Sequence, residues 1–436
     1  MPNHGGPVET GGTMNNPAGV GTAHEANRAE LLDAIRAAGQ ISRVELARLR
    51  GLNGATVSTA VRSLIRDGLV VESGKAESTG GKPAVLLSLA PDARFAVGVN
   101  LDHAGISYVI ANLGGAVVGR WRRPGAGAEP PDAVVARIGS EMRTLVAQVG
   151  IDRARLVGVG VVSPGPITGS NGMALTPPVM QAWRDFPLSD TLQAATGLPV
   201  RIENDATAAA IGEYWAGTVG PTRCFAALYM GTGLGAGIVV DGVVYRGTSG
   251  NTGEIGHICV DIDGPPCWCG SRGCVEALAG PAAVVAQARR LGVDMPGLGV
   301  AEDFASLARS AVQGEKTARE LIGRSARYIA VAAQTLSNIL DVDLVVLTGP
   351  SFVMSSSLYV PVIHERLAHS FFARGCHPVD VLISPNAAEA AAIGGAALVL
   401  QSELAPRKSG PPAPGGRRLI RGGSRQYQRV GTGAGG

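Results

Sequence analysis

Four potential metal ligands lie close together in a chain of 436 residues that has only six cysteines. Cys267, Cys269 and Cys274 fall within eight positions, and His257 precedes the first of them by ten. Three thiolates and one imidazole form a complete tetrahedral set for structural zinc, whereas a catalytic zinc keeps one position open. We therefore expect structural Zn²⁺ at this cluster. Free, reduced cysteines are the alternative, but such crowding in a cysteine-poor chain favours a metal.

A second group that could do chemistry lies in "VRIENDATAAAIGEYWAG", where a strand pattern runs into a helix pattern. Asn204 and Asp205 stand at the junction. A carboxylate at such a position can accept a hydroxyl proton or hydrogen-bond a polyol. Asn and Asp are also the preferred N-caps of helices. Capping and ligand binding are compatible, so the sequence leaves both roles open.

A glycine-rich turn follows the strand pattern "CFAALYM" and could bind phosphate. Glycine lets backbone N–H groups approach phosphate oxygens closely, although such turns are often only structural. The phosphate-binding candidates are Gly231, Thr232, Gly233 and Gly235. The corresponding earlier turn, from Asn100 to Gly105, carries bulky side chains where a nucleotide would need bare backbone.

The elements that must position these residues occur twice. "FAVGVNL", "GISYVIANLGG" and "AVVGRW" predict a β-meander that is followed by a helix and a strand. "CFAALYM", "AGIVVDG" and "VVYRG" repeat the plan after about 130 residues. The duplication predicts two related α/β lobes, with a ligand cleft between them.

Residues 24–91 have a different pattern. Three short helices are expected, the second beginning at Ser42 with a Ser42/Glu45 capping box and the third at Asn53. Two strands with a Gly-rich loop follow, as in a winged helix-turn-helix domain. A dimerisation module is the alternative reading of such a helical trio. The expected DNA-binding residues lie on the third helix and in the wing: Thr56, Ser58, Thr59, Arg62, Arg66 and Lys82.

Length and composition set the wider frame. The chain is long enough for two or three domains. We find neither an apolar run of about 18 residues nor a signal-peptide layout, so we expect a cytoplasmic protein without a membrane partner. Residues 1–23 and 401–436 are expected to be disordered tails. Seven of the basic residues lie in the second tail, which could contact nucleic acid non-specifically or simply keep the protein soluble.

Several of these segments together resemble a known family. "EIGH" from Glu254, "CWCGSRGCVE" from Cys267, "VVSPGPI", "ENDATAAAIGE" and "GTGLGAG" are similar to the signatures of the ROK family of repressors, open reading frames and sugar kinases. The resemblance covers roughly residues 94–400. The N-terminal domain resembles that of the family's repressor branch, which includes xylose and N-acetylglucosamine repressors.

The resemblance implies a two-lobed, actin-like ATPase fold, related to sugar kinases, Hsp70 and ribonuclease H, over residues 92–400. It also implies that His257 is shared between zinc and a sugar, and that Asp205 is the equivalent of the family's catalytic base. The residues it implies for sugar binding are Ser163, Gly165, Asn204, Asp205, Glu254, His257 and Glu276.

Three departures from the kinases of the family favour a sensor. Asn100 replaces the Asp of the first phosphate loop, Val179 replaces an Asn of the sugar site, and "VVLTGPSF" lacks a simple glycine run on the adenine side. Phosphoryl transfer depends on positioning and neutralising the phosphates, so these losses should be severe. We therefore expect no ATP or Mg²⁺, with Asp205 residual or vestigial.

The sequence thus predicts a sugar-responsive transcriptional regulator, a repressor of carbohydrate uptake or catabolism genes. Its expected partners are operator DNA, a sugar or sugar phosphate effector, and further copies of the chain in a homodimer or homotetramer. The alternative is an ATP-dependent sugar kinase with an appended DNA-binding domain.

Overall fold

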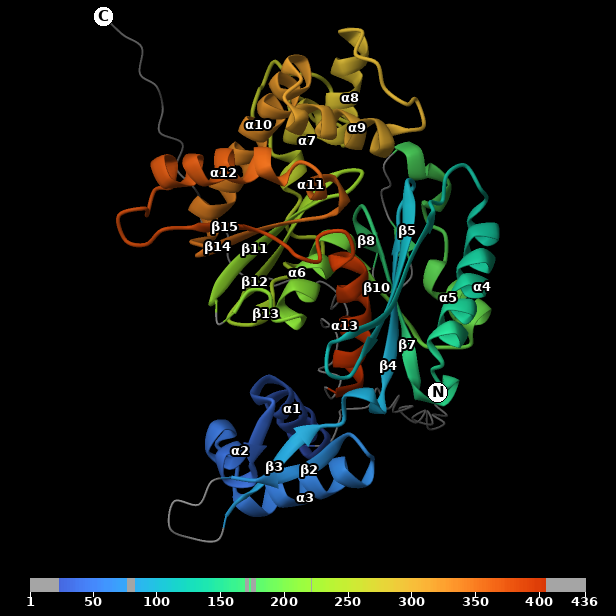
Figure 1. The fold of residues 1–436 in the computed structure, drawn as a ribbon, viewed down its shortest axis with the longest axis vertical. Helices are drawn as coiled ribbons and strands as arrows, with labels where there is room; N and C mark the ends of the chain where they lie inside the picture. The colour runs from blue at the N-terminus through green and yellow to red at the C-terminus, as the bar shows by residue number, and fades with distance from the viewer. Residues whose placement is uncertain (1–22, 77–82, 169–171, 174–177, 221, 405–436) are drawn as a thin grey trace, which may run out of the picture.

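The computed structural model describes residues 23–76, 83–168, 172–173, 178–220 and 222–404. A small N-terminal domain lies at one end of the molecule, and two larger lobes stand above it (Figure 1). Most of the two expected tails, and Lys82 in the expected wing, lie outside the described residues. The last helix continues to Leu404, four residues into the segment expected to be a tail.

The N-terminal domain is a winged helix-turn-helix. Ser42 and Glu45 form the expected capping box, and the Asn53 side chain accepts a hydrogen bond from the backbone N–H of Thr56. Strand β1, which the sequence analysis did not predict, pairs with β3 and completes a small sheet in the order β1-β3-β2. The elements are α1 (Ala23–Ala38), β1 (Gln40–Ser42), α2 (Arg43–Arg50), α3 (Gly54–Arg66), β2 (Val70–Lys75) and β3 (Val85–Leu89).

Each of the two lobes is built on a five-stranded mixed sheet. Lobe I has the order β10-β7-β4-β5-β6 and lobe II the order β15-β14-β11-β12-β13, so the two sheets share one topology and the predicted duplication is confirmed. The strands of lobe I are β4 (Phe95–Leu101), β5 (Gly105–Asn112), β6 (Val117–Pro124), β7 (Leu156–Ser163) and β10 (Val200–Asn204). Those of lobe II are β11 (Cys224–Met230), β12 (Leu234–Val240), β13 (Val243–Val244), β14 (Leu344–Thr348) and β15 (Asp380–Ile383).

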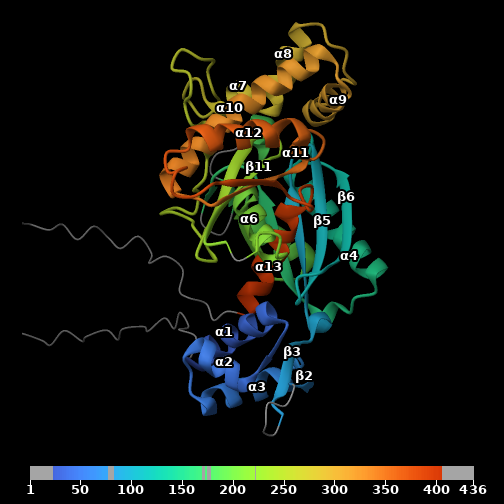
Figure 2. The same ribbon diagram turned by 60° about the vertical axis from the view of Figure 1, so that its left-hand side comes forward.

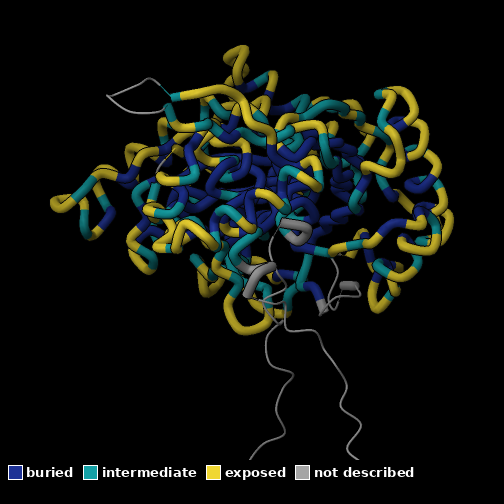
Figure 3. The backbone as a smooth tube through the Cα atoms, turned by 90° about the horizontal axis from the view of Figure 1, so that it is seen from below, coloured by how far each residue is buried: buried dark blue, intermediate teal, exposed yellow. Residues whose placement is uncertain are grey.

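Two helices, α6 (Asp205–Trp215) and α13 (Ala390–Leu404), lie between the sheets, and α13 descends toward the N-terminal domain (Figures 1 and 2). Buried residues concentrate in this central region, as the view from below shows (Figure 3). Lobe I carries α4 (Pro131–Val149), α5 (Leu188–Thr196) and the short hairpin β8 (Ile167–Thr168) and β9 (Gly172–Met173). Lobe II carries α7 (Val275–Ala279), α8 (Pro281–Arg290), α9 (Val300–Gln313), α10 (Lys316–Leu340), α11 (Pro350–Val353) and α12 (Ser356–Ser370).

Among the residues that the structure describes, no helix combines the length and the apolar character needed to cross a membrane.

Candidate functional site

A cavity of about 270 Å³ lies between the two lobes and gathers most of the residues that the sequence assigned to sugar binding. It is lined from lobe I by the turn after β7 and by the β10–α6 junction, and from lobe II by the segment before α7 and by α7 itself. Six of the seven expected residues line it: Gly165, Asn204, Asp205, Glu254, His257 and Glu276.

The seventh expected residue, Ser163, lies beside this cavity rather than among its lining residues. It pairs in register with Asn204 on the neighbouring strand. Its side chain is fully buried, and its hydroxyl oxygen has no hydrogen-bond partner among the described residues. Val179, which the sequence placed in the sugar region, does line the cavity and is about half exposed.

Asn204 and Asp205 combine the two roles that the sequence left open. The Asn204 Oδ1 accepts a hydrogen bond of 3.0 Å from the N–H of Thr207, and the Asp205 Oδ1 accepts one of 2.8 Å from the N–H of Ala206. Asn204 therefore caps α6, and Asp205 binds a free N–H of its first turn, while both residues line the cavity. Burial, together with the nearby Asp102 carboxylate, raises the pKa of Asp205 to about 8. Asp205 is thus mainly protonated at neutral pH, when it can donate as well as accept.

Two glutamates form the lobe II wall of the cavity. Burial, and then the neighbouring Glu276, raise the pKa of Glu254 to about 7. Glu276 has both carboxylate oxygens occupied: it accepts 2.7 Å from the indole N–H of Trp268 and 2.8 Å from the backbone N–H of Leu234. Glu276 therefore also fixes the glycine-rich turn between β11 and β12, a role the sequence analysis did not foresee.

The four expected metal ligands converge next to this cavity, with all their donor atoms within 4.8 Å of one another. Cys269 Sγ lies 3.8 Å from Cys274 Sγ, and Cys267 Sγ lies 3.5 Å from the Nδ1 of His257. A tetrahedral zinc with Zn–S near 2.3 Å and Zn–N near 2.0 Å places its ligand atoms roughly 3.5–3.8 Å apart. The donor set and its spacing therefore fit zinc, and Nδ1 is the histidine nitrogen that faces the thiols.

The backbone brings the thiols together through a tight turn. The N–H of Gly270 donates to the carbonyl oxygen of Cys267 over 3.0 Å, and the N–H of Cys267 donates to Ser271 over 2.8 Å. Gly270 has a φ of +96°, which a residue with a side chain rarely adopts. The Trp268 ring meets the His257 ring edge-on, with their centroids 5.0 Å apart. His257 is therefore held by a ring on one side while it lines the cavity.

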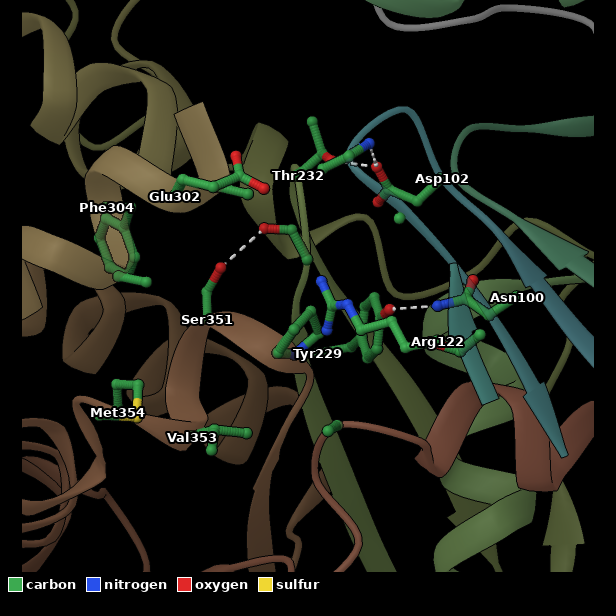
Figure 4. A pocket seen from close by; sticks show the side chains of 18 residues that line it. Asn100, Asp102, Arg122, Tyr229, Thr232, Glu302, Phe304, Ser351, Val353 and Met354 are labelled. Carbon is green, nitrogen blue, oxygen red and sulfur yellow. Dashed lines mark hydrogen bonds between the residues drawn. The ribbon is translucent and has the colours of Figure 1, made fainter. Parts of the chain in front are cut away.

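The glycine-rich turn from Gly231 to Gly235 faces the first turn of lobe I across the cleft. The Thr232 hydroxyl donates to Asp102 over 2.5 Å, and the same Asp102 oxygen accepts 3.0 Å from the N–H of Ala104. Asn100, on β4, donates to the hydroxyl of Tyr229 over 3.0 Å (Figure 4). A carboxylate thus stands between the two turns that would have to grip phosphate.

The sequence analysis did not single out Asp102. The available signal was that a charged side chain stands in the first turn, where a nucleotide would need bare backbone. It lines a second cavity of about 300 Å³ with Arg122, Glu302 and Ser351. Ser351 follows the Pro350 that departs from the glycine run on the adenine side, and its hydroxyl donates to the carbonyl oxygen of Gly231 over 3.0 Å (Figure 4). Thr348 is fully buried and donates to Glu213 instead of facing this cavity.

The expected DNA-binding residues lie along α3. Thr59, Arg62 and Arg66 are exposed, whereas Thr56 and Ser58 are half-buried. The Arg62 guanidinium folds back, donating to the Ser58 carbonyl oxygen over 3.2 Å and the Thr59 hydroxyl over 3.4 Å. These contacts involve exposed groups, so water can replace them and release the Arg62 guanidinium.

Comparisons with known proteins agree with this architecture. The ROK family model matches residues 97–402, and a winged helix-turn-helix DNA-binding model matches residues 26–71. A xylose repressor of Caldicellulosiruptor bescii is 28% identical over 375 residues, which cover 84% of this chain and 92% of that protein.

Two solved structures show the same arrangement. A ROK family transcriptional regulator, a homologue of the E. coli MLC protein, superposes with a TM-score of 0.69 at 24% identity over 87% of this chain and 97% of its own. A ROK family glucokinase from Streptomyces griseus, solved with glucose and AMPPNP, has a TM-score of 0.59 at 27% identity. It covers 70% of this chain and 98% of its own. The glucokinase therefore matches a smaller share of this chain than the regulator does.

Proposed function

Because this chain belongs to the ROK family and carries a winged helix-turn-helix domain ahead of the family domain, we propose that it is a sugar-responsive DNA-binding transcriptional regulator. We propose in addition that it represses genes for carbohydrate uptake or catabolism. The observation that carries the proposal is the presence, in one chain, of an exposed polar face on α3 and an interlobe cavity lined by carboxyl, amide and imidazole side chains. Likeness to a xylose repressor over most of both chains supports it.

The proposed macromolecular partner is operator DNA. Helix α3 presents Thr59, Arg62 and Arg66 to solvent, and a recognition helix of this kind reads base edges in the major groove. A two-fold assembly would place two such helices on a pseudo-palindromic site, so we propose a homodimer, or a homotetramer built from dimers. Such a regulator acts in the cytoplasm, where it meets the chromosome.

The proposed effector is a sugar or a sugar phosphate in the cavity between the lobes. Asn204, Asp205 and Glu254 offer an amide and two carboxyl groups whose raised pKa values let them donate or accept at neutral pH. Groups of this kind pair with adjacent hydroxyls of a sugar and disfavour a ligand that leaves them unpaired. Gly165 would bring backbone close to the sugar from the other side.

The proposed metal is structural zinc, held by His257, Cys267, Cys269 and Cys274. The spacing of their donor atoms supports it. Zinc, when bound, stabilises the local fold and fixes the orientation of a ligating imidazole. With Nδ1 directed to the thiols, the Nε2 of His257 would remain for a sugar hydroxyl.

A sugar kinase is the second candidate function, and the likeness to a glucokinase together with the retained Asp205 favours it. The placement of Asp102 argues against it. Its carboxylate accepts hydrogen bonds from both phosphate-binding turns, so it occupies the donors and adds a negative charge where phosphates would need positive ones. Asn100 also lacks the charge that would organise magnesium, and it is engaged with Tyr229.

The proposed function is tested by a mobility shift of DNA from upstream of the gene. The purified protein is titrated with that DNA alone and in the presence of a panel of sugars and sugar phosphates. We expect specific binding that one effector changes by at least about fivefold, the lower end of typical coupling between two sites. Absence of specific binding to genomic fragments, together with ATP-dependent sugar phosphorylation, would establish the kinase instead.

A further inference from the structure

The two central helices divide their closest contacts between the lobes. Helix α6 touches lobe II: a Cβ added to Gly237, on β12, would lie 2.3 Å from the carbonyl oxygen of Ala206. Helix α13 touches lobe I: a Cβ on Gly98, on β4, would lie 1.8 Å from the carbonyl oxygen of Ala392. Backbone therefore meets backbone without an intervening side chain. Each helix is therefore held most closely to one sheet, although α6 also continues directly from β10 of lobe I at Asn204.

The same two helices pack directly against each other. A Cβ on Gly394 of α13 would lie 1.7 Å from the carbonyl oxygen of Ala208 of α6, and one on Gly212 would lie 2.3 Å from that of Ala390. The lobes therefore meet along the interface of α6 with α13. A change in the angle between the lobes must appear there as a sliding or rotation of one helix against the other.

Helix α1 of the DNA-binding domain packs against the far end of α13 (Figures 1 and 2) and reaches the end of α6 through the Arg36 side chain. The Arg36 guanidinium lies over the Trp215 ring at the end of α6, 4.1 Å from its centroid. Leu31 and Ile35 of α1 share one buried apolar cluster with Ala396 and Leu400 of α13. Helix α1 thus contacts the ends of both central helices. Helix α13 packs on lobe I, and α6 packs on lobe II along its length while its Trp215 also abuts Gly115 of lobe I.

Helix α1 also holds the recognition helix. The Arg28 guanidinium donates to the Ser63 hydroxyl of α3 over 2.7 Å and forms an ion pair with Asp67, which follows α3. The opposite end of α6 begins at Asn204 and Asp205 in the cavity between the lobes. Helix α6 has eleven residues, so its first residue, Asp205, lies about 15 Å along the helix axis from its last, Trp215, at 1.5 Å per residue.

We propose that α1 moves when α6 shifts against α13, because the Arg36–Trp215 contact couples α1 to α6. Helix α1 would thereby transmit the state of the interlobe cavity to the recognition helix. This inference rests on the proposed function, since it assumes that a sugar in the cavity changes the lobe arrangement. Arg36 and Trp215 are positioning residues in this scheme. They touch neither the cavity nor the expected DNA surface, so their loss should uncouple two sites that remain intact.

The test measures two affinities and one ratio on the full chain: sugar binding by calorimetry, operator binding by mobility shift, and the factor by which saturating sugar changes operator affinity. In Arg36→Ala we expect sugar and sugar-free operator affinities within about twofold of wild type, but a response reduced to less than a third, because coupling is a property separate from either affinity. Arg36→Lys, which keeps a cation over the ring, should retain most of the response. Arg319→Ala, which removes an exposed arginine of lobe II, is the matched control and should respond as wild type does.

Trp215→Phe changes the same contact on the α6 side. It therefore distinguishes loss of the contact from a local effect of Arg36→Ala on α1. If the contact transmits the signal, Trp215→Phe lowers the response and the double variant lowers it no further than the stronger single variant. A full response in Arg36→Ala, or additive losses in the double variant, would overturn the inference. A wild-type protein that binds its operator but responds to no sugar would instead contradict the proposed function on which the inference rests.

Discussion

The Thr232 hydroxyl donates a 2.5 Å hydrogen bond to the carboxylate of Asp102 across the cleft between the two lobes. The two residues lie 130 positions apart in the chain. The contact joins the two turns that would grip the phosphates of a nucleotide. The Asp102 carboxylate thus occupies the position between these turns and links the two lobes. The same lobes are linked by Asn100, which donates to Tyr229.

Replacing Asp102 should restore nucleotide binding in part. In the Asn100→Asp, Asp102→Gly variant we expect MgATP to bind at least about tenfold more tightly than in wild type, because one repulsive charge leaves the phosphate position and a magnesium-organising carboxylate returns. Calorimetry with MgATP checks this. Asp102→Thr, which removes the charge but retains a side chain, should have an MgATP affinity between those of wild type and the double variant. Equal ATP affinity in wild type and variant would show that Asp102 does not exclude phosphate.

Loss of one thiol should release the metal. In Cys269→Ser we expect bound zinc, measured by elemental analysis, to fall from about one per chain to a small fraction, because a structural site needs its full ligand set. The melting temperature should fall as well, since metal binding contributes directly to folding. Cys376→Ser, an exposed cysteine outside the cluster, is the control and should keep its zinc. Stoichiometric zinc in Cys269→Ser would contradict the assigned ligand set.

Protonation of Asp205 should make stability depend on pH. Its pKa is raised from 3.8 to about 8 by burial, and then by Asp102, so between these pH values the folded state binds a proton that the unfolded state has lost. The associated stability is fully present below about pH 4 and is lost as pH rises through 8. Asp205→Asn removes this dependence. We expect the melting temperature of the variant relative to wild type to rise by a few degrees between pH 5 and pH 8. A constant difference would mean that Asp205 is ionised in the folded protein.

Removal of the Arg62 side chain should weaken operator binding. We expect about a tenfold loss in Arg62→Ala, because a specific arginine contact to a base or phosphate is worth roughly 1–3 kcal/mol. The sugar affinity should stay the same, since α3 lies in a separate domain from the cavity. Mobility shifts at several salt concentrations distinguish the two kinds of contact, because loss of a phosphate contact lowers the salt dependence by about one ion. Unchanged operator affinity would remove Arg62 from the DNA surface.

Glu254→Gln should blunt the sugar response and spare DNA binding. We expect sugar affinity to fall by tenfold or more, because the amide places two N–H donors where one carboxyl oxygen of Glu254 accepts, and a sugar hydroxyl that donates to that oxygen is left unpaired. Operator affinity without sugar should stay within about twofold of wild type. Calorimetry and mobility shift on the same preparation give both values. Loss of sugar-free operator binding would count against the assignment of Glu254 to the effector site.

Local signals in the sequence were sufficient for much of the architecture. The Ser42/Glu45 capping box, the Asn53 cap and the repeated strand patterns each depend on residues a few positions apart, and the structure contains all of them. The spacing of Cys267, Cys269 and Cys274 likewise identified a cluster whose donor atoms do converge. Short-range geometry is set by backbone preferences that a few neighbouring residues express, so such features can be read before the fold is known.

Contacts between distant segments were decided only by the tertiary structure. Asp102 meets Thr232, and Arg36 lies over Trp215, because two sheets and a helix pair bring them together across more than a hundred residues. The occupied carboxylate of Glu276 and strand β1 were likewise not expected. No local pattern encodes these pairings. They depend on close packing of the helices and sheets, which is possible because glycines such as Gly237 and Gly394 have no side chain at the points of contact. The chain's composition and spacing therefore determined which chemical groups are available, and the packing of the two lobes determined which of them act together.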